Sequence, residues 1–339
     1  MKICQVLAGN EDGGLEKHTI ELSKQLVNRG FDVTVIAHED FAESFENINF
    51  IPLDLSKSRN NFFILFKLYK ILKNGNFDIV HTQANKATAM VTKIKSFINA
   101  KIVSTLHNYK RNLSAFEKSD FVITVSDNIA KNLKTKNRIT VYNGISFNND
   151  EDLKIDLHSK YNIEKDKFII CSVARLTKVK RFELILSAIK NLNLHLILVG
   201  SGDEENNLKN EVEKLNIKNK VTFTGNLLNI EVKKIVSSSS LFVMSSDNEG
   251  FPYTFVETMF CRTPFISTPV SDMAKFLGDK YTIPFSNVEK LSDKIEYIKN
   301  NYNEVLKDFQ EKFEYAQNKF TIENMVNEAI EVYKKVLNK

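Results

Sequence analysis

The sequence predicts an α/β protein of two domains, each with a doubly wound parallel sheet. A chain of 339 residues is longer than one hydrophobic core usually organises, so two domains are expected. Short continuous apolar segments alternate with helical segments in both halves, a pattern typical of parallel strands covered by helices on both faces. Residues 146–167, between the halves, are polar and charged, and we interpret them as a linker.

The first predicted domain spans residues 1–147. Its apolar segments predict strands near Ile3–Leu7, Asp32–Ile36, Asp78–His81, Ile102–Leu106, Phe121–Val125 and Arg138–Val141. Helical segments between them include Leu15–Asn28, Asn61–Lys73 and Lys86–Phe97. The first nine residues carry one lysine and an apolar run too short for a secretory signal, so we expect a first strand there.

The second predicted domain spans residues 148–320 and repeats the same alternation. Its strands are expected near Phe168–Val173, Leu194–Val199, Val221–Thr224, Leu241–Met244, Pro264–Ser267 and Tyr281–Ile283. Helices are expected to begin near Arg181, Glu204, Glu231 and Tyr253. After Glu289 the pattern is helical to the end, with a last helix from about Ile322 to Leu337 within residues 321–339.

Composition excludes several classes of protein. Hydrophobic residues make up 42% and charged residues 26%, and the mean hydropathy is −0.25, which is normal for a soluble globular protein and excludes disordered and fibrous chains. No run approaches the roughly 18 apolar residues that span a bilayer. Three well-separated cysteines, Cys4, Cys171 and Cys261, fit neither a disulfide framework nor a zinc spacing, so a reducing cytoplasm is the expected location.

The net charge of +5 hides an uneven distribution. Residues 57–138 carry sixteen Lys or Arg against four Asp or Glu, whereas residues 1–56 carry four against ten. Within the basic region, Asn61–Lys73 is an apolar stretch of helix length with lysines at three-residue intervals, which suits an anionic membrane surface. The alternative is a packed core helix with a solvated lysine edge. Nucleic acid is not expected as a partner, since no binding motif accompanies the charge.

The segment Ser245–Glu257 joins a strand to a helix and places two glutamates eight positions apart. It follows the apolar strand Leu241–Met244 and precedes a helix predicted over Thr254–Cys261. Open α/β sheets bind ligands at the carboxyl ends of their strands, beside helix N-termini. Glu249 is therefore expected at the mouth of a crevice, and Glu257 on the first turns of the helix beneath it.

This segment, together with Met259–Pro264 and the strand Phe265–Ser267, resembles the signature of the family-four glycosyltransferases, retaining nucleotide-sugar enzymes of GT-B fold. The resemblance covers most of the chain, through the segments Gly13–His18, Val80–His81, Thr105–His107, Val125–Ser126, Val141–Ile145, Ala174–Leu176 with Lys180, Val199–Asp203 and Phe223–Gly225. It implies two Rossmann-like domains facing each other across a cleft, an N-terminal acceptor-binding domain, a C-terminal nucleotide-sugar-binding domain and a last helix that crosses back to the first. Ser146 departs from the family, which commonly has an aspartate there.

For the donor, the resemblance implies binding by residues of the second domain. Arg175 and Lys180 match the family's phosphate-binding pair: a guanidinium can bind two oxygens while an ammonium acts as a point charge. Glu257 is implied to accept hydrogen bonds from ribose hydroxyls, and Glu249 to hold the sugar near the reacting face, with its catalytic role left open. The adjoining Gly250, Phe251 and Pro252 are assigned to donor binding. The alternative is a solvated basic loop and two surface glutamates at a helix start.

In the first domain, glycines and histidines are the candidate site residues. Gly13 and Gly14, before the first helix, permit close approach of a ligand to the backbone, and we assign Gly14 to the donor and Gly13 to the acceptor. His107 follows a strand and is the preferred catalytic histidine, because a neutral imidazole can hydrogen-bond a sugar hydroxyl or a phosphate. His18 is assigned to the acceptor, with capping or packing as its alternative.

The expected function is transfer of a sugar from a nucleoside diphosphate sugar, UDP-linked, to a hydroxyl of a lipid-linked or cell-surface polysaccharide acceptor, in the cytoplasm at the inner face of the membrane. No metal and no cofactor are expected: Asp150-Glu151-Asp152 is spaced like a metal-binding acidic motif but is interpreted as a charged linker. The alternatives are a nucleotide-sugar 2-epimerase or inverting transferase of the same fold, and a nucleotide-sugar-binding accessory subunit without activity.

Overall fold

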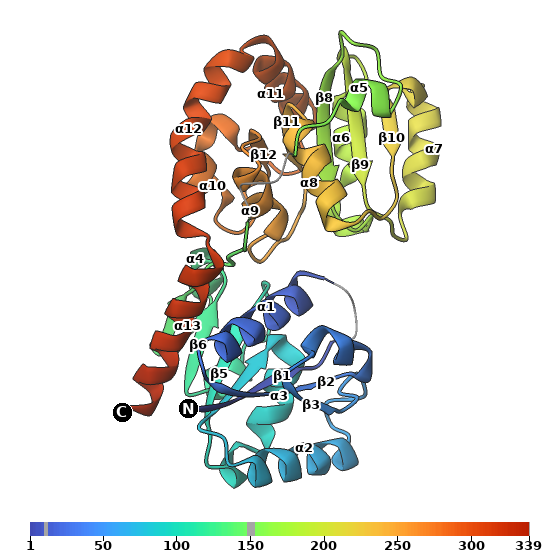
Figure 1. Ribbon diagram of the computed structural model, residues 1–339. Helices are drawn as coiled ribbons and strands as arrows, with labels where there is room; N and C mark the ends of the chain where they lie inside the picture. The colour runs from blue at the N-terminus through green and yellow to red at the C-terminus, as the bar shows by residue number, and fades with distance from the viewer. Residues whose placement is uncertain (10–12, 148–152, 339) are drawn as a thin grey trace. The chain divides into compact units, whose positions relative to one another are not determined.

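The computed structural model describes residues 1–9, 13–147 and 153–338, and divides the chain into two compact units (Figure 1). The first unit comprises Met1–Gly144 together with Thr321–Lys339, and the second comprises Ile145–Phe320. Residues 145–147, which the sequence analysis placed in the first domain, thus group with the second unit.

The first unit contains a seven-stranded parallel sheet in the order β3-β2-β1-β4-β5-β6-β7. The strands are β1 (Lys2–Leu7), β2 (Asp32–Ala37), β3 (Asn49–Pro52), β4 (Ile79–Gln83), β5 (Lys101–Leu106), β6 (Phe121–Thr124) and β7 (Arg138–Thr140). Six were predicted, and β3 was missed. It is a short, half-exposed edge strand that contains Pro52. The strand lacks the alternation and the buried run by which strands are detected.

Helices cover both faces of this sheet because side chains alternate between the faces along each strand. On one face, Ile3, Ile79 and Val103 form a core with α1 (Gly14–Asn28) and α13 (Ile322–Leu337). On the other, Cys4, Val80 and Ile102 pack against α2 (Phe62–Gly75) and α3 (Ala84–Lys93) (Figure 1). A short α4 (Asp127–Ala130) follows β6. The predicted helix Lys86–Phe97 is in fact α3 plus a separate 3-10 turn, Lys95–Phe97.

The last helix, α13, is part of the first unit although it follows the whole second unit in sequence. Met325, Val326, Ala329 and Tyr333 are buried in the α1 face of the sheet. The chain enters this helix beside Gly144, where a Cβ would lie 2.1 Å from the carbonyl oxygen of Thr321. A side chain at position 144 therefore cannot fit without moving the start of α13.

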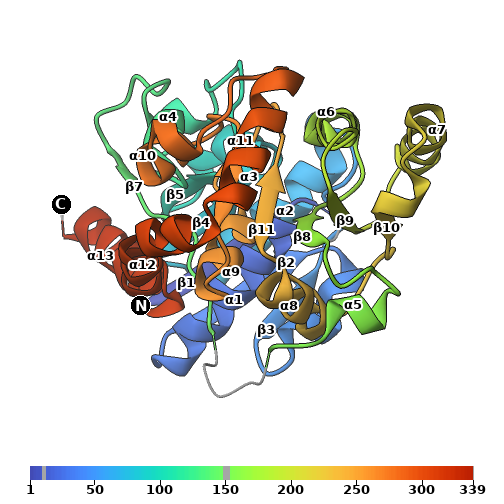
Figure 2. The same ribbon diagram turned by 90° about the horizontal axis from the view of Figure 1, so that it is seen from above.

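The second unit contains a five-stranded parallel sheet in the order β10-β9-β8-β11-β12, of which Figure 2 shows β10, β9, β8 and β11 side by side. Its strands are β8 (Phe168–Val173), β9 (Leu194–Val199), β10 (Val221–Phe223), β11 (Leu241–Met244) and β12 (Phe265–Ser267). A sixth strand predicted at Tyr281–Ile283 is wrong. Tyr281 and Ile283 are buried, but only Thr282 makes an isolated bridge, to Ser267, after a 3-10 turn over Asp279–Tyr281.

The helices of the second unit are α5 (Leu157–Lys160), α6 (Phe182–Ala188), α7 (Glu205–Leu215), α8 (Asn229–Ser238), α9 (Tyr253–Phe260), α10 (Met273–Leu277), α11 (Val288–Asn300) and α12 (Tyr302–Lys319). The described part of the predicted linker is folded onto this unit. Leu157 and Ile163 are buried, and the backbone N–H of Ile155 donates to Ser238 Oγ. The polar composition of residues 153–167 therefore marks a surface segment with two apolar anchors.

Candidate active site

The strand order of the second unit reverses between β8 and β11, and the carboxyl ends of these two strands carry the candidate donor residues. In open α/β sheets this is where ligands bind, because the following loops diverge and leave a crevice. Arg175 and Lys180 follow β8, and Glu249 follows β11. The topology thus places two cations and a carboxylate at one edge of the sheet, although Lys180 and Glu249 are 69 positions apart in the sequence.

Lys180 and Glu249 are in direct contact. The Lys180 ammonium donates to the Glu249 carboxylate over 2.6 Å, and the two side chains are 22% and 12% exposed. Both line a small pocket with Ser172, Ala174, Ser246 and Thr254. Limited contact with water strengthens this ion pair relative to a surface pair. The two residues were expected to contact different parts of one ligand, and in the structure they form an ion pair with each other.

The turn that carries Lys180 is fastened to the end of β11. Lys180 lies in a 3-10 turn, Lys178–Lys180, and the Ser245 hydroxyl donates to the carbonyl oxygens of Lys180 and Arg181 over 2.8 and 2.9 Å. The backbone N–H of Asp247 donates to the Val179 carbonyl. Arg181, in the left-handed region at φ 54°, forms ion pairs with Glu183 and Asp247, which raise the pKa of its guanidinium. These contacts hold Lys180 in place.

Arg175 is exposed, on a loop that packs closely on the loop after β9. The Leu176 N–H donates to the Ser201 carbonyl over 2.8 Å. Gly200, at φ 126°, and Gly202, at φ 156°, face this loop; a Cβ would lie 2.1 Å from the Ala174 oxygen and 2.4 Å from the Leu176 oxygen, respectively. Only glycine permits both the backbone conformation and the close approach. The two glycines therefore set the position of the Arg175 loop.

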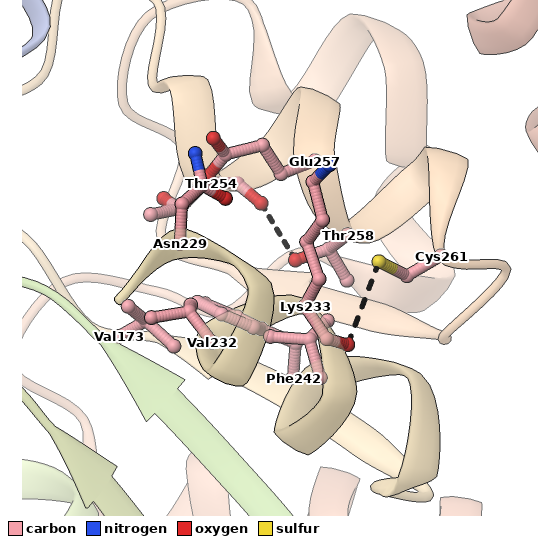
Figure 3. A pocket seen from close by; sticks show the side chains of 10 residues that line it. Val173, Asn229, Val232, Lys233, Phe242, Thr254, Glu257, Thr258 and Cys261 are labelled. Atoms are coloured by element: carbon pink, nitrogen blue, oxygen red, sulfur yellow. Dashed lines mark hydrogen bonds between the residues drawn. The ribbon is translucent and has the colours of Figure 1, made fainter. Parts of the chain in front are cut away.

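Glu257 lines a second pocket, which adjoins the first through shared walls of Val173, Phe242 and Thr254. Its side chain comes from α9, while Asn229 and Lys233 reach the same pocket from α8 (Figure 3). Thr258 is turned inward and donates to the Thr254 carbonyl over 2.6 Å. Cys261 closes the far wall; burial raises the pKa of its thiol to about 11, so it stays protonated at neutral pH. The pocket thus combines one carboxylate, one amide and one ammonium.

The turn Gly250–Pro252 connects β11 to α9. Gly250 accepts a hydrogen bond from Ser271 Oγ, and Pro252 occupies the N-cap of α9. The Phe251 ring is only 3% exposed and lies in an aromatic cluster with Phe255, Phe276 and Phe320, at centroid distances of 5.1–5.8 Å. Its side chain anchors the turn, so a ligand at this position meets the backbone of Phe251 and not its ring.

In the first unit three histidines lie near the carboxyl ends of β4 and β5: His81 within β4, His107 directly after β5, and His18 on α1. The rings of His18, from α1, and His107, after β5, meet edge to face with centroids 4.7 Å apart. His18 Nδ1 lies 3.2 Å from Asn143 Oδ1, and His18 is 3% exposed. Burial lowers the pKa of His18 to about 4 against the opposing effect of Asn143, and lowers the pKa of His81 to about 3, so both rings are neutral at physiological pH.

Gly13 and Gly14 begin α1 at the carboxyl side of β1. Gly13 is the N-cap in extended conformation, and its carbonyl accepts from the Lys17 N–H over 3.0 Å. The strand order of this sheet reverses here too, since β1 lies between β2 and β4. The structure therefore places these glycines at the switch point of the first sheet.

Several residues that shape these sites gave no signal in the sequence analysis. Asn229 and Lys233 lie on a predicted helix to which no role was assigned. Gln5 lies in a predicted strand, Gln83 lies just past the predicted strand Asp78–His81, and Tyr333 lies on the predicted last helix, and none of the three was predicted as a site residue. Gln5, a polar residue inside the otherwise apolar run Ile3–Leu7, is the one of these that the sequence could have indicated.

Among the described residues, no group of three His, Cys, Asp or Glu is placed to hold a metal ion; Asp150-Glu151-Asp152 lies outside the described residues. Cys4, Cys171 and Cys261 are free and buried. Across the described helices, none combines the length and the apolar character needed to cross a membrane.

Comparison with known proteins agrees with this architecture. Residues 154–319 match the family model for glycosyl transferases group 1, and residues 12–148 match that for glycosyltransferase family 4. The O-antigen biosynthesis glycosyltransferase WclY of Escherichia coli is 25% identical over 98% of both chains. A crystal structure of a glycosyltransferase from Rickettsia africae matches with a TM-score of 0.84 at 22% identity, covering 99% of this chain and 98% of the other.

Anabaena Alr3699/HepE, solved in complex with UDP, matches with a TM-score of 0.84 at 16% identity over 99% of this chain and all of the other, and it has also been solved with UDP-glucose. These likenesses define the class of the fold: the two parallel sheets are those of a GT-B protein. The chain belongs to the family-four glycosyltransferases, also described as glycosyl transferases group 1.

Proposed function

We propose that this glycosyltransferase is a retaining enzyme that moves a sugar from a UDP-sugar to a hydroxyl of a lipid-linked or cell-surface polysaccharide acceptor. The observation that carries the donor assignment is the Lys180–Glu249 contact at the β8/β11 switch point, with the Glu257 pocket adjoining it. HepE, which shares the fold, was solved with UDP and UDP-glucose, and WclY acts in O-antigen biosynthesis by name. Both support the proposal.

The chemistry assigns a role to each donor residue. Departure of the nucleoside diphosphate builds negative charge on its phosphates while the sugar carries positive charge, so cations aimed at the diphosphate lower the barrier. We assign Arg175 and Lys180 to this task, which then requires neither a metal nor a cofactor. Glu257 accepts hydrogen bonds from the ribose hydroxyls in its pocket.

Glu249 holds the sugar beside the diphosphate. When the phosphates bind the Lys180 ammonium, the Glu249 carboxylate loses its ion-pair partner. The carboxylate can then accept hydrogen bonds from sugar hydroxyls and stabilise the developing positive charge. Gly250, Phe251 and Pro252 contribute the backbone around the N-terminus of α9. Gly14 is assigned to the donor, and Gly13, His18 and His107 to the acceptor or the reacting sugar.

The first test is a thermal-shift screen with uridine, guanosine and adenosine diphosphate sugars. A ligand that binds only the folded chain raises stability by RT ln(1 + [L]/Kd), so a UDP-sugar is expected to raise the melting temperature most. The configuration of the product's anomeric centre, read by NMR, then decides between retention and inversion. A nucleotide sugar epimerised at carbon 2 would indicate the 2-epimerase. Binding of donor with neither transfer nor slow hydrolysis, unaltered by Glu249→Ala, would indicate an accessory subunit.

We further propose that the first unit binds an anionic membrane, at the inner face of the cell membrane, through one face of α2. One face of α2 packs in the core through the buried residues Ile64, Leu68 and Leu72, which agrees with the alternative interpretation of this segment as a core helix. The opposite face is exposed, with Phe62, Phe63 and Phe66 at 72%, 76% and 45% exposure, and the neighbouring 3-10 turn adds Phe97 at 65%. A helix that serves only as core does not require three exposed phenylalanines.

Lysines border these rings. Lys70 lies over the Phe66 ring at 4.7 Å, and Lys73 lies over the Tyr69 ring at 5.3 Å. Lys73 also donates to the Tyr69 hydroxyl of the same helix over 2.8 Å. Other basic residues of the region are held by other parts of the protein: Lys86 and Lys93 donate to backbone carbonyls, and Lys95 is paired with Asp120. The arrangement of exposed aromatic rings with basic residues beside them suits the interface of an anionic bilayer.

Vesicle sedimentation tests this surface. The variant Phe62→Ser/Phe63→Ser is expected to reduce binding to vesicles that contain phosphatidylglycerol by at least tenfold, since two large apolar side chains are lost from the interface. Leu228→Ser, which removes a hydrophobe of 72% exposure from the second unit, is the matched control and is expected to bind as wild type. Equal binding by both variants would contradict the assignment.

A further inference from the structure

A chain of hydrogen-bonded polar side chains runs through the core face of the first sheet. Gln5 on β1, His81 and Gln83 on β4 and Thr105 on β5 are 0–1% exposed and are paired across the strands, Gln5 with His81 and Gln83 with Thr105. They share the face on which Ile3, Ile79 and Val103 form the core. Polar groups are costly at such positions unless they are hydrogen-bonded, and apolar residues would fill the space.

The directions of these hydrogen bonds fix the protonation of His107. Gln83 Nε2 donates to Gln5 Oε1 over 2.9 Å, which leaves Gln83 Oε1 facing His107 Nε2 at 2.7 Å. An amide oxygen can only accept, so His107 Nε2 must carry the proton. Its Nδ1 then holds a lone pair. Within the described part of the chain that atom has no hydrogen-bond partner, and the His107 side chain is partly exposed.

The orientation of Gln83 is itself set by residues behind it. Gln5 Nε2 donates to the Tyr333 hydroxyl over 3.4 Å, and that hydroxyl lies 2.6 Å from His81 Nδ1. His81 Nε2 lies 2.7 Å from Thr105 Oγ1. Tyr333 comes from α13, so the final helix of the chain contributes to the alignment of a residue at the carboxyl end of β4.

Two further observations point to a functional role. Ala84, next to Gln83, has φ 62°, a left-handed conformation that costs about 1 kcal/mol or more for a residue with a Cβ. Such strain persists where the surroundings hold a side chain in a required position. In addition, burial and the neighbouring His18 and His81 keep the pKa of His107 well below its usual range, so the ring is neutral.

We propose that Gln83 is a positioning residue for His107: it holds the imidazole as the tautomer protonated on Nε2, so that Nδ1 accepts a hydrogen bond from a substrate hydroxyl. Gln5 and Tyr333 keep the Gln83 amide in the orientation that this requires. The inference rests on the proposed function for its substrate, a sugar or acceptor hydroxyl, but the tautomer itself is a property of the protein without any ligand.

The tautomer can be measured directly by two-bond ¹⁵N–¹H correlation NMR on protein with labelled histidine. We expect a protonated Nε2 and an unprotonated Nδ1 for His107 in the wild type. Gln83→Leu is expected to give a mixture of tautomers, whereas Gln83→Glu, which still offers an oxygen to Nε2–H, keeps the wild-type one. His195, hydrogen-bonded to Thr222 in the second unit, is an internal control whose shifts stay constant. A protonated Nδ1 in the wild type, or an unchanged tautomer in Gln83→Leu, overturns the proposal.

Kinetics then separate positioning from folding. Gln83→Leu is expected to lower the turnover of sugar transfer about tenfold, the effect of one weakened hydrogen bond, while Kd for UDP is unchanged, because Arg175, Lys180 and Glu257, which are assigned to the diphosphate and the ribose, lie in the second unit. A rise in KM for the acceptor identifies its hydroxyl as the partner of Nδ1, and slower donor hydrolysis identifies a donor hydroxyl. Unchanged turnover in Gln83→Leu overturns the role in catalysis. A wild type that transfers no sugar rejects the proposed function and leaves the NMR result standing.

Discussion

Replacing Lys180 by methionine removes a positive charge and keeps most of the side-chain volume. The Lys180 ammonium is bound to the Glu249 carboxylate over 2.6 Å, so a diphosphate that binds Lys180 must replace this ion pair. A charge-assisted hydrogen bond contributes about 1.5–3 kcal/mol. Because Lys180 exchanges one anion for another, we expect the lower end of this range, which corresponds to a Kd for UDP about tenfold weaker.

Calorimetric titration with UDP at constant ionic strength measures this loss. Lys178→Met is the matched control, because Lys178 is an exposed lysine in the same 3-10 turn and its replacement changes the net charge equally. Nonspecific attraction would weaken UDP binding alike in both variants. If Lys180→Met binds as wild type, or if Lys178→Met loses as much, the assignment of Lys180 to the diphosphate is wrong.

The Glu249→Gln variant distinguishes the two partners. Neutralising the carboxylate releases Lys180 from its competing ion pair, so UDP is expected to bind as tightly as in the wild type or a few-fold more tightly. Transfer should nevertheless become slower, because the group that faces the developing positive charge is gone. Weaker UDP binding in this variant would show that Glu249 supports the nucleotide site itself and does not compete with it.

Two further predictions concern the framework of the sites. Gly200→Ala places a Cβ 2.1 Å from the Ala174 oxygen at φ 126°, so we expect a loss of more than about 2 kcal/mol in the free energy of unfolding, measured in urea, and weaker UDP binding; wild-type stability would refute the close approach. The buried histidines predict acid sensitivity: unfolded chains bind protons near pH 6.5, whereas the folded pKa values are about 4 for His18 and about 3 for His81. The unfolded state therefore binds more protons below pH 6.5, and stability falls as pH drops toward 4, by up to about 1.4 kcal/mol per pH unit for each histidine. Equal unfolding midpoints at pH 7 and pH 5 would contradict this.

Much of the fold followed from local sequence patterns. Continuous apolar runs located eleven strands, because buried parallel strands need apolar residues on both faces. The exceptions had physical causes. β3 is a half-exposed edge strand, whereas Tyr281 and Ile283 are buried, Tyr281 against Phe309 of α12, in a segment that makes only an isolated bridge to β12. Burial and strand pairing are separate requirements, and the sequence displays only the first.

The candidate site divides in the same way. Lys180, Glu249 and Glu257 could be chosen from the sequence because each matches a position in the motifs of the family-four glycosyltransferases. Their pairing could not, since Lys180 and Glu249 meet only through the strand order of the sheet. Gln5, Gln83 and Tyr333 are separated by up to 328 positions and carry no local motif. A hydrogen bond between such residues depends on distance and direction in space, and only the tertiary structure sets both.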